Sequence, residues 1–520
     1  MDYMRRWELA VALDPSREQP LFLQLASTIA EDIRCGRLKP GESLPGSREL
    51  AECLGVNRNT VVAGYDELLA EGLVNTRVGG GTFVAEPAPG PPSAPSPPVE
   101  LPTYALAPPL HLAQPGSTLA PGMLMMANGT PDVRLFPARP LARAFRRAIE
   151  HRGRSLLTCT DPCGHVRLRT ELATMLSRTR GLVATPDHLM VTRSIEQGID
   201  LVARTLLAPG DVVAVEAFGY PPAWSVLKLA GARIEPMPLD HEGLDVDALE
   251  MLLSRQRIRA VFLTPHHQFP TTVVMSQARR ERLARLALAH GFAIIEDDYD
   301  HEFHYAGKPV LPIAAGPGRA NVIYVGSLSN LLAPGISTGF VVAPPPVFER
   351  LVSLRAASDA RGDAAVECAI AELFEDGELL RHVRRMRRIY EARRDVLVTA
   401  LTRRLGGALD FRVPDGGMAL WAHVDEAIDI AAWARAGERE GVKFQGARAY
   451  DFLGREQPFL RLGFSYHDEV ELAEAVGRMA RALATVRHAR PVKRAATAVK
   501  PATYAAHRHA GRDREGIGRG

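Results

Sequence analysis

Three adjacent side chains near residue 59 carry hydrogen-bonding groups of the kinds that read nucleic acids. Arg58, Asn59 and Thr60 follow one another in the segment NRNTVVAGYDELLAEG. A guanidinium or a carboxamide can bond in a bidentate manner to a purine edge, whereas hydroxyl groups position phosphates. We therefore expect Arg58 and Asn59 to read the bases of double-stranded DNA, and Ser47 and Thr60 to contact its backbone.

A helix-turn-helix is the element that would position these residues. The segment RELAECLGV predicts a first helix, capped by the hydroxyl of Ser47 and with Glu49 at the positive end of its dipole. Gly55 supplies a tight turn, and a second helix is expected to start near Asn57. This second helix can turn an apolar face toward a core, made of Val61, Val62, Tyr65, Leu68 and Leu69. Its N-terminal end then stays exposed, as in a recognition helix.

Two further elements flank this pair of helices. Before it, apolar residues at helical spacing predict another helix, which ends at Gly36. These apolar residues are Leu21, Leu25, Ile29 and Ile33. After it, LVNTRVGGGTFVA alternates apolar and polar residues around three glycines. That pattern predicts a β-hairpin, flanked by Arg77 and Thr82, whose backbone can approach phosphates.

The ordered string from Leu38 to Val84, LKPGESLPGSRELAECLGVNRNTVVAGYDELLAEGLVNTRVGGGTFV, resembles the GntR-type winged helix nearly end to end. Taken singly, each arginine could be surface charge and each glycine a turn; the whole string is what carries the resemblance. It implies DNA contacts at Ser47, Arg48, Arg58, Asn59, Thr60, Arg77, Gly79, Gly80, Gly81 and Thr82.

The remainder of the chain divides by composition. Apolar runs such as HLMVT, DVVAVE, AVFLTP, AIIEDD and VIYVGS alternate with amphipathic stretches, which is typical of an α/β domain with a mostly parallel sheet. The predicted organisation is an N-terminal extension over 1–17, an α+β winged helix over 18–85, a Pro-rich linker over 86–122, the α/β domain over 123–486 and a basic, disordered tail over 487–520.

Composition narrows the class of protein. The 520 residues are 46% hydrophobic and 24% charged, and no apolar run approaches the ~20 residues needed to cross a bilayer. The N-terminus lacks the apolar core of a secretion signal, so we expect a cytoplasmic protein without a membrane partner. The five cysteines are scattered, and the pair in CTDPC has no second pair, so we expect neither disulfides nor a metal site.

Several segments of the α/β domain together resemble the aminotransferase-like domain of MocR-type regulators, a subfamily of GntR regulators. They are NGTPDVRLFP, TDPCGHVRLRTELATMLSRTRG, TLLAPGDVVAVEAFGYP, FLTPHHQFPTTVVMSQARR, IIEDDYDHEFHY, YVGSLSNLLAPGISTGFVV, HVRRMRRIYEARRD and FLRLGFS. The resemblance implies a fold-type I aminotransferase fold, pyridoxal phosphate (PLP) as cofactor, and a head-to-tail homodimer.

The same resemblance locates a cofactor site. It implies that Asp297 holds the pyridinium proton, that Tyr299 faces the ring oxygen, that Tyr220 lies against the ring and that Arg461 takes a ligand carboxylate. The further positions that it places around the cofactor are His267, Ser327, Ser329 and Asn330.

The cofactor site departs from the family pattern at its most reactive position. Asn330 stands where the Schiff-base lysine is expected, and an amide nitrogen cannot form an imine. Ser337 replaces a phosphate-binding arginine, and Glu196 lies in the phosphate turn, where a carboxylate would repel the phosphate. Bound PLP is therefore expected to be noncovalent and weak, with no other cofactor.

The sequence is compatible with three functions. The favoured one is a transcriptional regulator whose large domain dimerises and senses a small effector, either noncovalent PLP or an amino or carboxylic acid on Arg461. The second is a PLP-dependent aminotransferase with an accessory DNA-binding domain, which Asn330 disfavours because transamination needs the lysine. The third is a ligand-free dimeric scaffold that spaces two winged helices on DNA.

Overall fold

The computed structural model describes residues 13–15, 19–34, 36–77, 81–85, 122–126, 129–158, 161–307 and 310–488. The chain forms two compact units, Met1–Pro108 and Pro109–Gly520. Within the described ranges, no helix is both long and apolar enough to span a bilayer.

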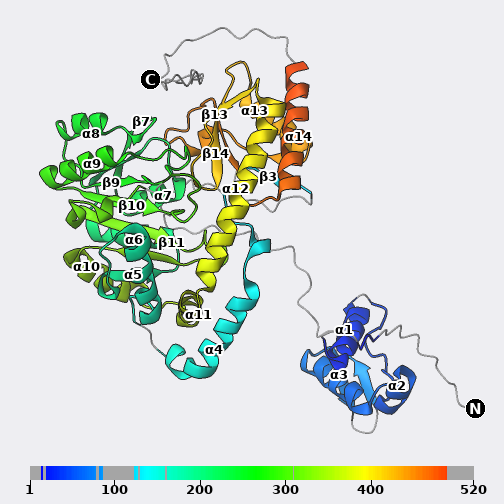
Figure 1. The fold of residues 1–520 in the computed structure, drawn as a ribbon. Helices are drawn as coiled ribbons and strands as arrows, with labels where there is room; N and C mark the ends of the chain where they lie inside the picture. Colours follow the sequence, from blue (N-terminus) through cyan, green and yellow to red (C-terminus); the bar gives the residue numbers. More distant parts are fainter. Residues whose placement is uncertain are drawn as a thin grey trace, which may run out of the picture. The chain divides into compact units, whose positions relative to one another are not determined.

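The first unit is a three-helix winged helix (Figure 1). Helices α1 (Leu21–Arg34), α2 (Ser47–Leu54) and α3 (Arg58–Ala70) precede the antiparallel strands β1 (Val74–Arg77) and β2 (Gly81–Val84). Leu25, Ile29, Val61 and Leu68 are fully buried, because the 3.6-residue period of α1 and α3 turns these residues toward one core. The predicted helix-turn-helix and its hairpin are confirmed.

Details of the first unit differ from the sequence prediction. Ser47 is the first residue of α2 rather than its cap, because Gly46 is the residue that keeps the extended backbone of an N-cap. The Ser47 hydroxyl instead accepts a hydrogen bond from Nε of Arg58 at 3.3 Å. In α3, Leu69 is 42% exposed, because the buried stripe follows Val61, Tyr65 and Leu68.

The second unit is built on a seven-stranded mixed sheet (Figure 1). Its order is β4-β12-β11-β10-β9-β5-β6, and only β12 runs antiparallel to its neighbours. The strands are β4 (Leu189–Thr192), β5 (Val212–Glu216), β6 (Arg233–Met237), β9 (Ala260–Leu263), β10 (Ala293–Asp298), β11 (Val322–Ser327) and β12 (Gly339–Val342). The strands predicted from the apolar runs are present.

Helices cover both faces of this sheet. Val213 and Val215 pack with α6 (Ile195–Leu206), α7 (Pro221–Leu229) and α10 (Pro345–Ser358), whereas Val212 and Ala214 pack with α8 (Val246–Leu253) and α9 (Gln277–His290). Alternate residues of one strand thus enter opposite cores, which explains why the strands read as unbroken apolar runs. A short hairpin joins β7 (Leu239–Asp240) to β8 (Gly243–Leu244).

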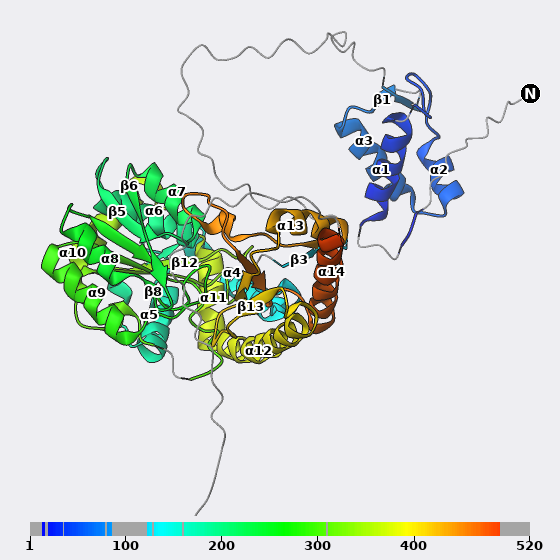
Figure 2. The same cartoon turned by 90° about the horizontal axis from the view of Figure 1, so that it is seen from above.

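The C-terminal part adds a second, smaller sheet. Its strands are β13 (Leu409–Phe411), β14 (Ala419–Val424) and β16 (Phe459–Gly463), and β3 (Leu124–Met125) pairs with β15 (Val442–Lys443). The helices of this region and of the connection to the large sheet are α4 (Ala138–Leu156), α5 (Val166–Arg180), α11 (Ala364–Glu375), α12 (Glu378–Leu405), α13 (Ile430–Arg439) and α14 (Glu469–His488). Figure 2 shows the long α12 running beside α14 and β13.

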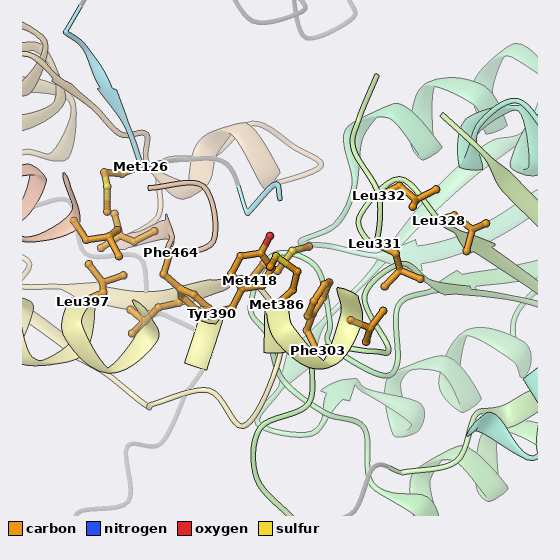
Figure 3. Close-up of a cluster of buried hydrophobic side chains, with 14 of the residues drawn as sticks. Met126, Phe303, Leu328, Leu331, Leu332, Met386, Tyr390, Leu397, Met418 and Phe464 are labelled. Carbon is orange, nitrogen blue, oxygen red and sulfur yellow. The ribbon is translucent and has the colours of Figure 1, made fainter. Parts of the chain in front are cut away.

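One continuous core joins the smaller sheet to the large one. Figure 3 shows Tyr390 and Met386 of α12 lying near Met418 and Phe303. The rings of Phe303 and Tyr390 have centroids 5.2 Å apart, and both side chains are buried. Phe303 belongs to the segment that follows β10, so this packing fixes that segment, and the residues around it, against α12.

A buried carboxyl at the end of β5 makes the stability of this unit depend on pH. Glu216 is 2% exposed, and its Oε2 accepts hydrogen bonds from the backbone N and the Oγ of Thr264 at 3.1 and 2.9 Å. Burial raises the pKa of Glu216 to about 7 from an ordinary value of 4.5. The folded state therefore retains a proton on Glu216 that the unfolded chain releases. The free energy of unfolding decreases as the pH rises from 4.5 through about 7, because the folded state then has to hold a buried charge.

We expect Glu216→Gln to reduce this loss. The apparent Tm of the wild type should fall more than that of E216Q between about pH 5 and about pH 8, with a difference of up to about 3 kcal/mol in the free energy of unfolding. Glu349→Gln, which alters an exposed carboxyl on α10, is the matched control. Parallel Tm curves for all three proteins would contradict the prediction.

Candidate functional site

The exposed N-terminal end of α3 presents the residues predicted to read DNA. Arg58 and Asn59 are exposed and Thr60 is half-buried. The Asn57 side chain caps the helix by accepting a hydrogen bond from the backbone N of Asn59 at 2.9 Å. Arg48 is exposed at the start of α2, and the bond between Arg58 and Ser47 brings the two helix N-termini together. This end of the unit concentrates cationic side chains and helix dipoles that suit DNA phosphates.

The wing lies beside the loop that precedes α2. In the hairpin, Arg77 pairs with Gly81 and Thr76 with Thr82. The backbone N of Leu44 donates to the carbonyl of Thr82 at 2.7 Å, which ties the wing to the helix-turn-helix. Gly81 has φ +94°, a conformation that favours glycine. The predicted contacts Gly79 and Gly80 lie outside the described residues.

In the second unit, Asp297 ends up deeply buried at the end of β10. Asp297 is only 3% exposed, and its Oδ1 has no hydrogen-bond partner among the described residues. Burial raises the pKa of Asp297 well above its ordinary value, and the nearby carboxylates of Asp298 and Glu196 raise it further. A buried acceptor without a partner, held in an acidic environment, suits a cationic or proton-donating ligand group.

The residues around Asp297 bond to one another. The Tyr299 hydroxyl donates to the carbonyl of His267 at 3.0 Å, and Nδ2 of Asn330 donates to the carbonyl of Tyr299 at 2.9 Å. Ser327 accepts at Oγ from the backbone N of Ser329 at 3.0 Å. The structure thus brings the predicted positions 267, 299 and 330 together, but it is the backbone of His267, not its ring, that bonds to Tyr299.

The position expected to hold a phosphate contains a carboxylate instead. Glu196 lies in the first turn of α6, where its Oε1 accepts a hydrogen bond from the hydroxyl of Tyr220 at 2.7 Å. Ser194 caps the same helix by accepting from the backbone N of Gln197 at 3.2 Å. The helix N-terminus that could receive an anion therefore has its own negative charge beside it.

The residues present therefore fit only part of PLP. Asp297 offers a partner to a ring nitrogen, and Tyr220 and Tyr299 offer aromatic and hydroxyl contacts. Asn330 supplies no amine, and Glu196 opposes a phosphate. Of the described lysines in this unit, Lys228 lies over the Phe452 ring at 4.6 Å and Lys443 lies in β15, while Lys308 lies outside the described residues. Among the described residues, none of the side chains that form this site offers an amine for a covalent link to PLP.

Arg461 provides the cationic side of this candidate site. It lies on β16, opposite Trp421 of β14, and it is 3% exposed. Its Nη1 donates to the carbonyl of Pro270 at 2.8 Å, and no carboxylate of the described residues lies within ion-pair distance. A guanidinium carries five N–H donors, so a buried one without a carboxylate partner can still bind an anion.

Phe269 also belongs to this candidate site, although it was not predicted from the sequence. Its ring lies edge-on to Tyr220 at 5.4 Å, to Tyr450 at 5.5 Å and to Tyr299 at 6.0 Å, and the guanidinium of Arg461 lies 4.5 Å from its centroid. It therefore connects the aromatic residues to the cation. A lone phenylalanine after an apolar strand carries no pattern that would have marked it.

Comparisons with known proteins identify relatives of both units. A family model for bacterial regulatory proteins of the gntR family matches residues 21–84, and one for aminotransferases of class I and II matches residues 124–479. The chain is 31% identical to the probable rhizopine catabolism regulatory protein MocR of Rhizobium meliloti, over 90% of this chain and 95% of the relative. It is also 31% identical to the pyridoxine biosynthesis transcriptional regulator PdxR of Corynebacterium glutamicum, over 76% of this chain and 82% of the relative.

The second unit also resembles solved enzymes. The structure of LysN, an α-aminoadipate aminotransferase from Thermus thermophilus, superimposes with a TM-score of 0.66 at 29% identity, covering 71% of this chain and 94% of the enzyme. A GntR winged helix joined to an aminotransferase fold defines a class of DNA-binding transcriptional regulators. The chain belongs to the MocR-type regulators of the GntR family.

Proposed function

We propose that this regulator senses a small ligand in the pocket of its second unit and that ligand binding alters its affinity for operator DNA. The favoured ligand is an amino acid, or a related carboxylic acid, bound without a covalent link. The observation that carries this proposal is Arg461, a buried guanidinium with no carboxylate within ion-pair distance among the described residues. A ligand carboxylate would supply the missing counter-charge in a bidentate pair.

The acidic side of the pocket supports an amine at the other end of the ligand. Burial raises the pKa of Tyr299 well above its ordinary value; Asp300 and Asp297 raise it further and Arg461 lowers it, so Tyr299 lies near charges of both signs. The unpartnered Oδ1 of Asp297 and the carboxylate of Glu196 can receive an ammonium group. A zwitterion would satisfy both sides at once, whereas a simple carboxylate would satisfy only one.

Noncovalent PLP is the second candidate, because Asp297 offers its ring a buried partner. We expect this binding to be weak, since the phosphate would face Glu196. We further propose that the protein acts in the cytoplasm as a head-to-tail homodimer and that it has no transaminase activity, because Asn330 offers no imine-forming amine.

Arg461→Gln should weaken amino-acid binding by at least about tenfold, because a charge-assisted hydrogen bond to a carboxylate contributes ~1.5 to 3 kcal/mol. Quenching of Trp421, which lies opposite Arg461 in the register of β14 and β16, would measure binding across a panel of amino acids and simple carboxylates. Arg448→Gln, at an exposed arginine paired with Glu456, is the matched control. Equal affinities for the wild type and R461Q would contradict the proposal.

A further inference from the structure

We propose that His266, His267 and His304 form a binding site for a divalent transition-metal ion, of the class of Zn²⁺. The three side chains come from two segments, one after β9 and the other after β10. One potential ligand nitrogen from each histidine lies within 4.8 Å of the others. Three imidazoles with an open fourth position are a ligand set that suits zinc and its neighbours in the first transition row.

The histidines form a compact, stacked cluster. The ring centroid of His266 lies 4.4 Å from that of His267 and 4.3 Å from that of His301. The rings of His267 and His304 are nearly parallel, at 16° and 6.5 Å. His266 and His267 are 3% and 1% exposed, so the cluster belongs to the interior rather than to a solvated surface.

The unpartnered nitrogens of these rings point to a ligand. Both nitrogens of His266, both of His304 and Nε2 of His267 have no hydrogen-bond partner among the described residues. Buried polar atoms are nearly always bonded, so five such atoms in three adjacent rings need an explanation. A metal ion would satisfy one nitrogen of each ring at once.

Asp300 holds His267 in the orientation that metal binding requires. Its Oδ1 lies 2.8 Å from Nδ1 of His267, and both side chains are buried. A carboxylate on one ring nitrogen leaves the other free to bind a metal and makes it a better ligand. That free nitrogen, Nε2, lies beside Gly416, where an added Cβ atom would clash with it.

An ion would draw the three rings closer together. With Zn–N bonds of about 2.0 to 2.1 Å, tetrahedral ligand atoms lie roughly 3.4 Å apart. The spacing of up to 4.8 Å requires modest rotation of the rings. The site is separate from the ligand contacts on Arg461, although the carbonyl of His267 also binds the Tyr299 hydroxyl.

Titration of the full-length, metal-free protein with Co²⁺ tests the site, because nitrogen-bound Co²⁺ absorbs visible light. We expect one equivalent to bind with visible absorption and to be displaced by Zn²⁺. Asp300→Asn should weaken Zn²⁺ binding about 10- to 100-fold, and His304→Gln should weaken it further. His290→Gln, at an exposed histidine on α9, should have no effect.

The basic tail contains the sequence HRH, which could bind metal by itself. A full-length variant with His507→Gln and His509→Gln should therefore retain the high-affinity site. The proposal is overturned if the wild type binds no Co²⁺, if H304Q binds it as tightly as the wild type does, or if binding is lost only with the tail histidines. Circular dichroism of each variant, and a Tm equal to that of metal-free wild type, would show that a loss of binding is not a loss of folding.

Discussion

Arg58→Ala should weaken binding to operator DNA by about 10- to 100-fold, the largest loss expected from a single change in the winged helix. One bidentate contact between an arginine and a purine contributes ~1 to 3 kcal/mol of discrimination. Arg58 is exposed at the first turn of α3 and is oriented by its bond to Ser47. The operator can be selected from a random duplex library with the full-length protein, and affinities measured by fluorescence anisotropy at fixed salt.

The pattern of loss separates base reading from general attraction to DNA. If Arg58 reads a base, R58A should bind the selected operator less tightly and should discriminate less at one base pair of each half-site. Arg34→Ala, which removes an exposed arginine of α1 paired with Glu71, should leave both properties unchanged. An equal loss of affinity for all sequences would assign Arg58 to phosphate contact instead.

Asn330→Lys should convert a protein that forms no covalent adduct with PLP into one that does. In the wild type, Nδ2 of Asn330 donates to the carbonyl of Tyr299, so the side chain already points toward the residues of the pocket. A lysine there would supply the missing amine beside Asp297 and Tyr299. After incubation with PLP, N330K should gain visible absorption. After reduction by borohydride, it should also gain mass. The wild type should show neither change.

The carboxylate of Glu196 sets how readily this adduct forms. Glu196→Gln in the N330K background should tighten PLP binding, because it removes the negative charge beside the phosphate position. Asn330→Gln, which lengthens the side chain by one carbon without adding an amine, is the matched control and should form no adduct. If N330K also forms none, even with Glu196→Gln, the pocket does not accept the PLP ring, and the second candidate ligand would be discarded.

Much of the architecture is determined by patterns that lie close together in the sequence. The apolar stripe of α1, the turn at Gly55 and the alternation around the wing predict the winged helix correctly. The apolar runs predict β4, β5, β9, β10 and β11, because strands buried on both faces are apolar at most positions. Such signals depend on helix and strand periodicity, which each segment carries by itself.

The sequence also identifies the chemistry that the second unit lacks. Where the resemblance to MocR-type regulators predicts a lysine, before LLAPG, the chain has Asn330, and this difference does not depend on packing. The antiparallel direction of β12, by contrast, could not be predicted, because the run GFVV is as apolar as the parallel strands around it. Strand direction depends on the path of the connecting chain rather than on the strand itself.

Only the tertiary structure brings together residues that are distant in the sequence. Phe269, in the segment after β9, contacts Tyr220 at the start of α7 and Arg461 of β16, and Glu196 accepts a hydrogen bond from Tyr220, 24 positions away in the sequence. The histidine cluster forms in the same way, from His266 and His267 after one strand and His304 after the next. The helices, the strands and the asparagine at position 330 can be read from the sequence, since these are properties of single segments. The partners of each side chain were decided by the packing of the sheet, because contacts between segments depend on how the whole chain folds.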